Sequence, residues 1–360
     1  MGSLVDGEVE VIRSSRELKA LAVEWESLAL SVGLPMLSHT WVLACAEALY
    51  EIGELHIITV RLRGSLVGVA PLVAIKRAGV RYLELAGASY LYEPSGLLYR
   101  DEESLAALTR AVVSCGCPVV LARIPAESPL IPQMRSIVCG RGVVVEGAVG
   151  YTLSVPISSG WKEYVASLSS RRRYDLRRAR HRAEEGGVVT VRVCSPRPKE
   201  IEEGMAEFIR IEATGWKERN GSSLSQRDNL RRFFFRYAAL ASQSGTLRLS
   251  FLDVAGNPIA AQISVVYADR LWVLKIGYDE AWSRCSPGWQ LLAETMKYAF
   301  ECKLKSYEFL GSDESWLDGW ITERHGYRAI GCYPATARGM YGLAADTIGR
   351  IHARVSSRFQ

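Results

Sequence analysis

Short runs of alternating apolar and polar residues recur along the chain, separated by stretches with apolar residues every three or four positions. The first pattern predicts strands and the second predicts helices. We therefore expect strands at residues 8–12, 55–62, 66–75, 81–85, 118–124, 143–155, 188–193, 247–253, 259–267, 271–277 and 306–310. We expect helices at 16–32, 40–50, 102–113, 160–182, 199–218, 226–242 and 290–300, and a basic helix near 344–354. This mixed order indicates the α/β (α+β) class.

One pattern of strands and turns occurs twice. Residues 61–85 and 251–276 each read as strand, turn, a pair of small residues, strand, turn and strand. Gly64 and Gly256 lie 192 residues apart, and the small pairs that begin at Gly68 and Ala260 keep that offset. Two copies of one α/β unit explain the pattern, with a boundary near residues 155–160. A chance resemblance of two β-meanders is the alternative.

The stretch 271–289, LWVLKIGYDEAWSRCSPGW, has the most suggestive local order. A strand runs into a turn, and a loop carries Ser286, Pro287 and Gly288 to the start of an amphipathic helix. Backbone N–H groups and the dipole at a helix start favour phosphate or pyrophosphate groups. An ordinary strand-to-helix connection has the same appearance, so this pattern alone does not decide between the two.

Composition excludes several classes of protein. The chain has 360 residues, of which 48% are hydrophobic and 23% charged, so it has room for two domains with ample cores. It has no apolar run of about 18 residues and no secretory signal, so we expect no membrane span. Its eight cysteines and five histidines do not cluster as metal ligands do. We expect no metal, and free thiols in a reducing cytoplasm.

Positive charge is concentrated in one place. The net charge of +5 is modest, but seven arginines lie within residues 171–182. Several of them share a helix face, which suits the phosphates of coenzyme A, of a nucleotide-linked substrate or of tRNA. A solvated basic face is the alternative.

Four ordered segments carry a resemblance to a known family. They are SLSSRRRYDLRRARHR (167–182), EATGWKERNG (212–221), GNPIAAQISV with LWVLKIGYDEAWSRCSPG (within 256–288), and YEFLGSDESW (307–316). Together they resemble the CelD/BioF2-like acyltransferases, a branch of the GNAT superfamily related to the FemAB peptidyltransferases. Pro35 and Trp41 also stand where the N-terminal half of that family has Pro and Trp.

The resemblance implies two tandem GNAT-like lobes, at residues 1–155 and 156–360, each a mixed, mostly antiparallel sheet flanked by helices. It implies acyl transfer from a thioester or from an aminoacyl-tRNA onto an amine. Two departures bear on the donor and the site. The glycine-rich phosphate loop of GNAT proteins is reduced here to Arg284-Cys-Ser-Pro-Gly288, with one glycine. Trp316 and Leu317 stand where the family often has Tyr and Lys, so no role for a lysine carries over.

Direct acyl transfer to an amine needs a base, a group that polarises the carbonyl oxygen, and an acid for the leaving thiol or hydroxyl. The base candidates are Asp279 and Glu212, with Glu314 behind them. Both also have a structural alternative. Asp279 could cap a turn, and Glu212 could pair with an arginine on a helix surface. No Gly-x-Ser-x-Gly elbow and no evident Cys/His pair is present, so we expect no covalent intermediate.

Lys275 interrupts an apolar strand, so its ammonium group must find an anion or a cleft. Tyr278 and Ser286 are the hydroxyls best placed to protonate a leaving group, although a structural role is open for both. Cys285 lacks a histidine partner and is a poor candidate for a nucleophile.

Two further groups of candidates follow. The candidates for the acyl carrier are Ser286, Gly288, Trp289, Arg173, Arg177 and Arg178. The candidates for the acceptor, all within the matched segments, are Trp216, Lys217, Glu314 and Trp316.

We therefore expect an N-acyltransferase that uses acyl-coenzyme A as co-substrate and a small-molecule amine, either a metabolite or a cell-envelope precursor, as acceptor. The first alternative keeps the fold and takes aminoacyl-tRNA as the donor. The second is a non-catalytic binding module for polysaccharide or envelope assembly, which the reduced glycine loop slightly favours.

Overall fold

The computed structural model describes residues 7–215, 221, 223–311, 317, 319, 320 and 322–356. The chain divides into two compact units. The first comprises Met1–Ala46, Tyr50–Gly150 and Gly326–Gln360, and the second Glu47–Leu49 and Tyr151–His325. The division at residues 155/156 expected from the sequence stays a proposal about folding domains. Within the described residues, no helix is long and apolar enough to cross a membrane.

The first unit contains two sheets. Its strands are β1 (Glu8–Ile12), β2 (Ile57–Leu62), β3 (Ser65–Ala70), β4 (Leu72–Arg77), β5 (Val80–Leu85), β6 (Leu98–Tyr99), β7 (Val119–Pro125), β8 (Gly142–Glu146) and most of β15 (Glu323–Pro334). One sheet has the order β1-β2-β3-β6, and β4, β5, β7, β15 and β8 follow one another in the other. Only β5 and β7 run parallel; the other recorded pairs are antiparallel.

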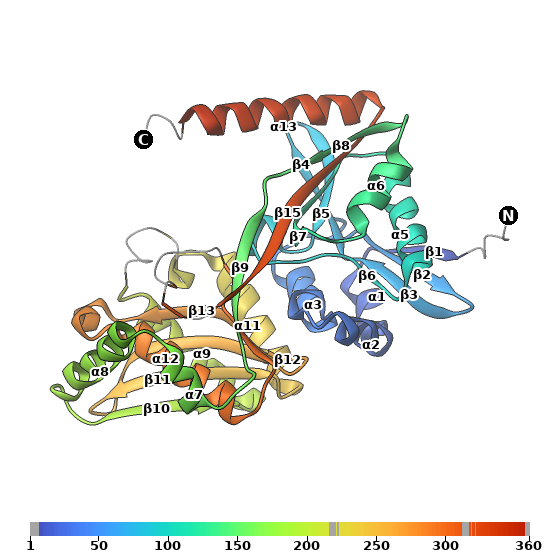
Figure 1. Ribbon diagram of the computed structural model, residues 1–360. Coiled ribbons are helices and arrows are strands. Elements are labelled where there is room, and N and C mark those ends of the chain that lie inside the picture. Colours follow the sequence, from blue (N-terminus) through green and yellow to red (C-terminus); the bar gives the residue numbers. More distant parts are fainter. Residues whose placement is uncertain are drawn as a thin grey trace. The chain divides into compact units, whose positions relative to one another are not determined.

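Helices of the first unit pack on these sheets around an apolar core that includes Leu83, Leu108, Leu121 and Met134. They are α1 (Ser15–Ala20), α2 (Ala22–Val32), α3 (His39–Ala48), α4 (Ala88–Leu91), α5 (Glu102–Ser114), α6 (Leu130–Val138) and α13 (Ala337–Ser356), with the 3-10 turn η1 (Pro35–Leu37). The last of them is a single long helix (Figure 1).

The second unit contains one antiparallel run of strands extended by a parallel pair. The order is β10 (Val189–Cys194), β11 (Leu247–Val254), β12 (Asn257–Tyr267), β13 (Arg270–Tyr278), β14 (Ser306–Glu308) and β9 (Gly150–Pro156). Only β13 and β14 run parallel. The helices are α7 (Trp161–Ser167), α8 (Ser170–Glu184), α9 (Ile201–Glu212), α11 (Asp228–Gln243) and α12 (Pro287–Glu301), with 3-10 turns η2 (Pro198–Glu200), η3 (Leu224–Gln226) and η4 (Glu280–Cys285).

Helices cover both faces of the second sheet (Figure 1). Leu271 and Val273 of β13 pack in one apolar cluster with Leu292 and Met296 of α12. On the opposite face α9 lies so close that a Cβ atom at Gly277 would come within 3.0 Å of Glu212. A sheet between helices, with mostly antiparallel strands, confirms the fold class expected from the sequence.

The two predicted repeats share a turn conformation. Arg63 and Gly64 have φ angles of 50° and 79°, and Ala255 and Gly256 have 49° and 78°. Two successive residues with positive φ are typical of the tight hairpin turns that match the twist of a β-ribbon. The copies then differ: Pro71 lies between β3 and β4 in the first unit, where the second unit has the continuous strand β12. Because proline lacks the N–H that a central strand donates, the strand predicted at 66–75 is broken there.

Three other predicted elements are divided in the structure, the first being the helix expected at 16–32, which is α1 and α2 with Leu21 between them. The helix expected at 160–182 is two helices, because Leu168 and Ser169 are extended and the Ser169 side chain accepts from the backbone N–H of Arg172 to start α8. The strand expected at 143–155 is β8 and β9, with residues 147–149 between them.

The turn at Arg63 offers a test of this backbone description. Arg63→Asn should stabilise the protein by about 0.5–1 kcal/mol, because asparagine tolerates positive φ at this turn position better than arginine. The midpoint of urea unfolding measures the effect. Arg63→Ala removes the same exposed side chain but keeps a residue that disfavours this φ, so it should not stabilise; equal gains in both variants would contradict the turn assignment.

Candidate functional site

One extra residue changes the alternation of side chains along β13. On β12, Ile263 and Ser264 are neighbours, but their partners on β13 are Lys275 and Val273. Leu274 therefore has no partner on β12 and forms a β-bulge, a feature common beside active sites. As a consequence, Val273 faces the side of α12 whereas Lys275 faces the side of α9.

The strands β13 and β14 separate close to this bulge. They pair in parallel only from Arg270 to Trp272, opposite Ser306 to Glu308, although β13 continues to Tyr278. A strand edge that has left its neighbour presents backbone N–H and C=O groups to whatever lies beside it. Along the second half of β13, therefore, no pairing with β14 occurs among the described residues.

The structure brings two predicted residues, Lys275 and Glu212, into direct contact. The Nζ atom of Lys275 donates to Oε1 of Glu212 at 2.8 Å, and the backbone N–H of Leu224 donates to Oε2 at 2.9 Å. Glu212 is the last residue of α9, and only 1% of its surface is exposed. The anion that the sequence required for Lys275 is thus Glu212, and both oxygens of this carboxylate already accept a hydrogen bond.

Asp279 and Tyr278 lie together at the end of β13. Asp279 Oδ1 accepts from the backbone N–H of Ala281 at 3.0 Å. Asp279 therefore caps η4, which is the structural alternative considered for it. Among the described residues, its Oδ2 atom makes no hydrogen bond or ion pair. The ring of Tyr278 lies against the start of α12, since a Cβ atom at Gly288 would come within 3.3 Å of Cδ1.

The start of α12 combines a residue of positive φ with a proline. Ser286 has a φ of 47°, and Pro287 is the first residue of the helix. The carbonyl of Ser286 accepts from the N–H groups of Trp289 and Gln290 at 3.0 and 3.2 Å. Proline at this position has no N–H to satisfy, which is why it is favoured there. Gly288 has no side chain, so another group can approach the backbone closely at this end of the helix.

Arg172, which the sequence analysis did not select, is buried against this helix. Its guanidinium carbon lies 3.4 Å from the ring centre of Trp289 and 5.5 Å from that of Trp320, and only 6% of the residue is exposed. Trp289 is the third residue of α12. A guanidinium group in this position adds to the positive potential that the helix dipole creates at the start of α12.

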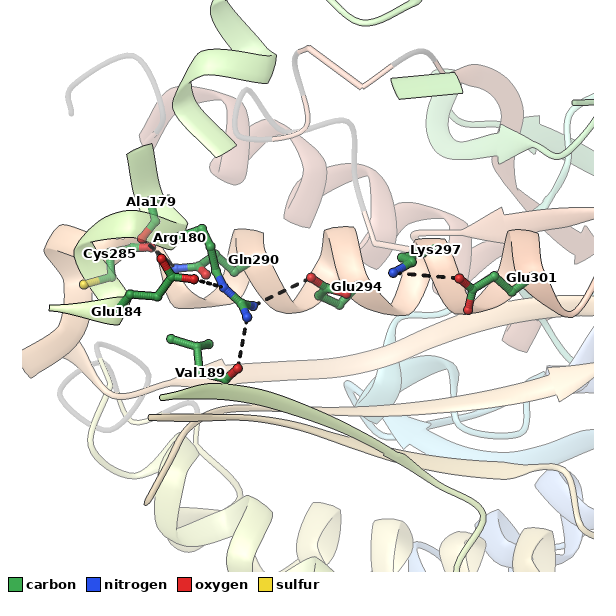
Figure 2. Close-up of polar contacts among 9 residues, drawn as sticks. All are labelled: Ala179, Arg180, Glu184, Val189, Cys285, Gln290, Glu294, Lys297 and Glu301. Carbon is green, nitrogen blue, oxygen red and sulfur yellow. Dashed lines mark hydrogen bonds and ion pairs between the residues drawn. The ribbon is translucent and has the colours of Figure 1, made fainter. Parts of the chain in front are cut away.

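Polar contacts hold α8 against α12 and β10 (Figure 2). The buried amide of Gln290 donates to the carbonyls of Ala179 and Cys285 at 3.1 and 2.7 Å. Arg180 donates to the carbonyl of Val189 at 2.9 Å, and its guanidinium also lies 3.0 Å from Glu184 and 3.8 Å from Glu294. Because these bonds cross from one helix to the next, the position of α8 and of Arg172 is fixed relative to the start of α12.

The predicted arginines of α8 have different surroundings. Arg173 donates to the carbonyls of Ala166 and Leu168, so it closes the end of α7. Arg177 and Arg178 are exposed and form no ion pair with any described residue. Arg177 and Arg178 thus present a solvated basic face and Arg173 contacts the end of α7, and a role of these three residues in carrier binding stays a prediction.

One hydrogen-bonded Ser–His contact was also missed. The Oγ atom of Ser154 lies 2.8 Å from Nε2 of His325, and Ser154 pairs in the sheet with Glu308. Burial raises the pKa of Glu308, although the hydroxyl of Ser306 and nearby His325 and Arg270 act in the opposite sense. Ser154 and His325 are 171 positions apart, so no local pattern in the sequence indicated this cluster.

Cys285 is a poor nucleophile in the structure, as expected. Only 6% of it is exposed, and burial raises the pKa of its thiol. Within the part of the chain that the structure describes, no group of three His, Cys, Asp or Glu side chains has a geometry for holding a metal ion. The predicted acceptor residues Trp216, Lys217, Glu314 and Trp316 lie outside the described residues.

A sequence signal for Arg172 existed in the helical period. The buried residues of α8 are Arg172, Ala179 and Ala183, which are spaced seven and four apart and therefore share one face. An arginine on the apolar face of its helix is expected to be buried. The number of arginines in a segment does not separate such a residue from exposed ones.

Comparisons with known proteins agree with this geometry. Residues 170–317 match the family model described as the acetyltransferase (GNAT) domain. The crystal structure of FemX is similar with a TM-score of 0.59 and 14% identity, over 94% of this chain and 100% of that one. A domain described as part of a lysylphosphatidylglycerol synthetase from Agrobacterium fabrum gives 0.57 and 11%, over 93% and 97%. No curated protein sequence matches the chain.

At such low identities, the two structural likenesses concern the fold alone, whereas the family match concerns the segment that contains β13, α12 and Arg172. That segment coincides with the one whose residues carry the resemblance in the sequence. Residues 170–317 are therefore an acetyltransferase (GNAT) domain, and the chain is an acyltransferase whose fold is shared with FemX.

Proposed function

We propose that this acyltransferase moves an acyl group from acyl-coenzyme A to the amine of a small metabolite or envelope precursor, by direct attack. The observation that carries the proposal is Arg172, a buried cation stacked on Trp289 in the first turn of α12. A pyrophosphate at this helix end supplies the negative charge that both the arginine and the helix dipole favour. Gly288 and Ser286 lie at the same end.

The separated edge of β13 supports the same chemistry. A thioester carbonyl placed beside the bulge at Leu274 meets backbone N–H groups of a strand that no longer pairs with β14. Fixed N–H donors aimed at a developing oxyanion stabilise the transition state of acyl transfer. Because α12 begins after the same strand, one ligand can place its phosphates at the helix and its thioester at the strand edge.

We propose distinct roles for the four catalytic candidates. Asp279 has an uncommitted carboxylate oxygen and acts as the base for the acceptor amine. Glu212, whose two oxygens are occupied, holds Lys275 in position on the face of α9. The hydroxyl of Tyr278, beside the start of α12, protonates the leaving thiolate.

A second donor, aminoacyl-tRNA, is favoured by a different observation. Arg177 and Arg178 are exposed on α8 without acidic partners among the described residues, and exposed Tyr174 lies on the same helix. Unneutralised arginines beside an aromatic ring suit a nucleic-acid backbone. This reading requires charged tRNA for activity and a steep fall of activity with salt.

Binding of coenzyme A tests the main proposal. Acetyl-coenzyme A should raise the melting temperature, since a ligand at about 100 times its dissociation constant adds about 2.7 kcal/mol of stability. It should also release free thiol when amines are added. Arg172→Gln should bind about tenfold or more weakly, because a hydrogen bond to a charged group is lost.

The matched control for that experiment is Arg110→Gln, which removes an exposed arginine of α5 in the first unit. It should bind acetyl-coenzyme A as the parent does. If neither a melting shift nor thiol release occurs with any acyl-coenzyme A, the donor is not a coenzyme A thioester, and charged tRNA becomes the substrate to assay.

The Lys275–Glu212 pair generates a prediction about the free energy of unfolding. Glu212→Gln should destabilise by about 3–5 kcal/mol, because it leaves a buried ammonium without its anion. The double variant Glu212→Gln, Lys275→Met should recover part of that loss, since both charges are then gone. Denaturant unfolding of both single variants and the double variant measures the coupling. Additive effects would show that the two side chains do not depend on each other.

Ser154 tests the absence of a covalent intermediate. Ser154→Ala should change kcat less than about tenfold, whereas loss of a nucleophile typically costs several orders of magnitude. Intact-protein mass spectrometry after mixing with acetyl-coenzyme A should show no acetylated parent enzyme that disappears in this variant. An acetyl adduct on Ser154 that turns over with amine would replace direct attack by a two-step reaction.

A further inference from the structure

Two arginines contact a buried histidine in the first unit, and a lysine lies opposite one of them. Arg13 Nη1 lies 3.4 Å and Arg81 Nη2 lies 3.2 Å from Nδ1 of His56. Lys76 is the partner directly opposite Arg81 in the antiparallel pair of β4 and β5. The side chains of Arg13, Lys76 and Arg81 are exposed, whereas only 6% of His56 is exposed.

The groups between these cations are neutral. Burial first, and then the charges of Arg81 and Arg13, lower the pKa of His56 to about 4. Because its Nδ1 atom faces two donors, the ring proton is assigned to Nε2, which lies 3.4 Å from Sγ of Cys115. Burial raises the pKa of the Cys115 thiol, and that of nearby Cys117. Neither the imidazole nor the thiols offset the positive charge at neutral pH.

The nearby carboxylates are engaged elsewhere. The carboxylate of Glu17 accepts from the backbone N–H groups of Arg13 and Ser14, at the start of α1. Glu54 Oε2 accepts from the backbone N–H of Glu51 at 2.7 Å, and Glu84 forms an ion pair with Arg77 at 2.6 Å. Among the described residues, the side chains of Arg13, Lys76 and Arg81 have no acidic partner within ion-pair distance.

This arrangement is unfavourable for an empty surface. Like charges placed directly opposite one another on two strands destabilise the pair, and Lys76 and Arg81 hold such positions. Two guanidinium groups also compete for a single nitrogen lone pair of His56. Both costs disappear when an anion with several acceptor oxygens lies between the cations, since each arginine then gains its own oxygen partners.

We propose that Arg13, Lys76 and Arg81 form a binding site for a phosphate group, with His56 at its base. The ligand is a small molecule, either inorganic phosphate or a phosphomonoester. Arginine forks match phosphate oxygens, and the exposed lysine adds a point charge on the same side of the sheet. This site is independent of the proposed acyl transfer, because all of its residues belong to the first unit.

Binding has a spectroscopic consequence at His56. When the guanidinium groups turn to the phosphate, Nδ1 loses two neighbouring cations and gains a neighbouring anion. Both changes favour the protonated ring. The pKa of His56 should therefore rise by about 1 unit or more on binding, and NMR titration of the His56 ring protons in the full-length protein measures it.

The experiment compares inorganic phosphate, glycerol 3-phosphate and chloride at constant ionic strength. Each phosphate probe that binds should raise the melting temperature and move the His56 ring signals, whereas chloride should do neither. A response to inorganic phosphate alone identifies a phosphate-ion site, and a stronger response to the ester identifies a phosphomonoester site. Arg81→Gln and Arg13→Gln should each weaken binding about tenfold or more.

Two comparisons exclude a merely structural role. In chloride, Arg81→Gln should be at least as stable as the parent, because the repulsion from Lys76 is removed. Arg110→Gln in the same unit, and Arg177→Gln with Arg178→Gln on α8, should leave the response of His56 to phosphate unchanged. The proposal is overturned if phosphate moves neither the melting temperature nor the His56 pKa, or if Arg81→Gln leaves both responses intact.

Discussion

The extra residue at Leu274 is the constraint on which the site of the second unit depends. A regular strand would place Val273 and Lys275 on the same face, where α12 and its apolar cluster leave no partner for an ammonium group. The bulge turns Lys275 to the face of α9 and lets Ile276 pack toward α12. It also lies just beyond the point where β13 and β14 cease to pair. One extra residue thus sets the charge arrangement next to the point where this pairing ends.

The buried pair of Lys275 and Glu212 shows why this local change is costly to alter. An uncompensated buried charge costs several kcal/mol, so each of the two side chains makes the other tolerable. Gly277 completes the arrangement, because a side chain there would meet Glu212 at 3.0 Å and push α9 away. Gly277, near the end of β13, therefore determines how close the Glu212 carboxylate comes to Lys275.

The sequence predicted the fold class, most elements and the helix start at Ser286 and Pro287, because these follow from local periodicity and from turn chemistry. It also predicted that Lys275 needs an anion, and it named Glu212 as a candidate without joining the two. That pairing joins residues 63 positions apart across α9 and β13. The contact between Ser154 and His325 spans 171 positions. No local pattern records such contacts, whereas Arg172 was detectable from the buried face of α8.

Five arginines of this chain fall into three physical classes, and only burial and contact partners tell these classes apart. Arg173 and Arg180 satisfy backbone carbonyls and fix helices in place. Arg172 is desolvated against Trp289 and Trp320, whose aromatic faces support its charge. Arg13 and Arg81 share one neutral imidazole instead. Neither the net charge nor the density of arginines along the sequence tells these classes apart, because burial and contact partners arise only in the folded chain.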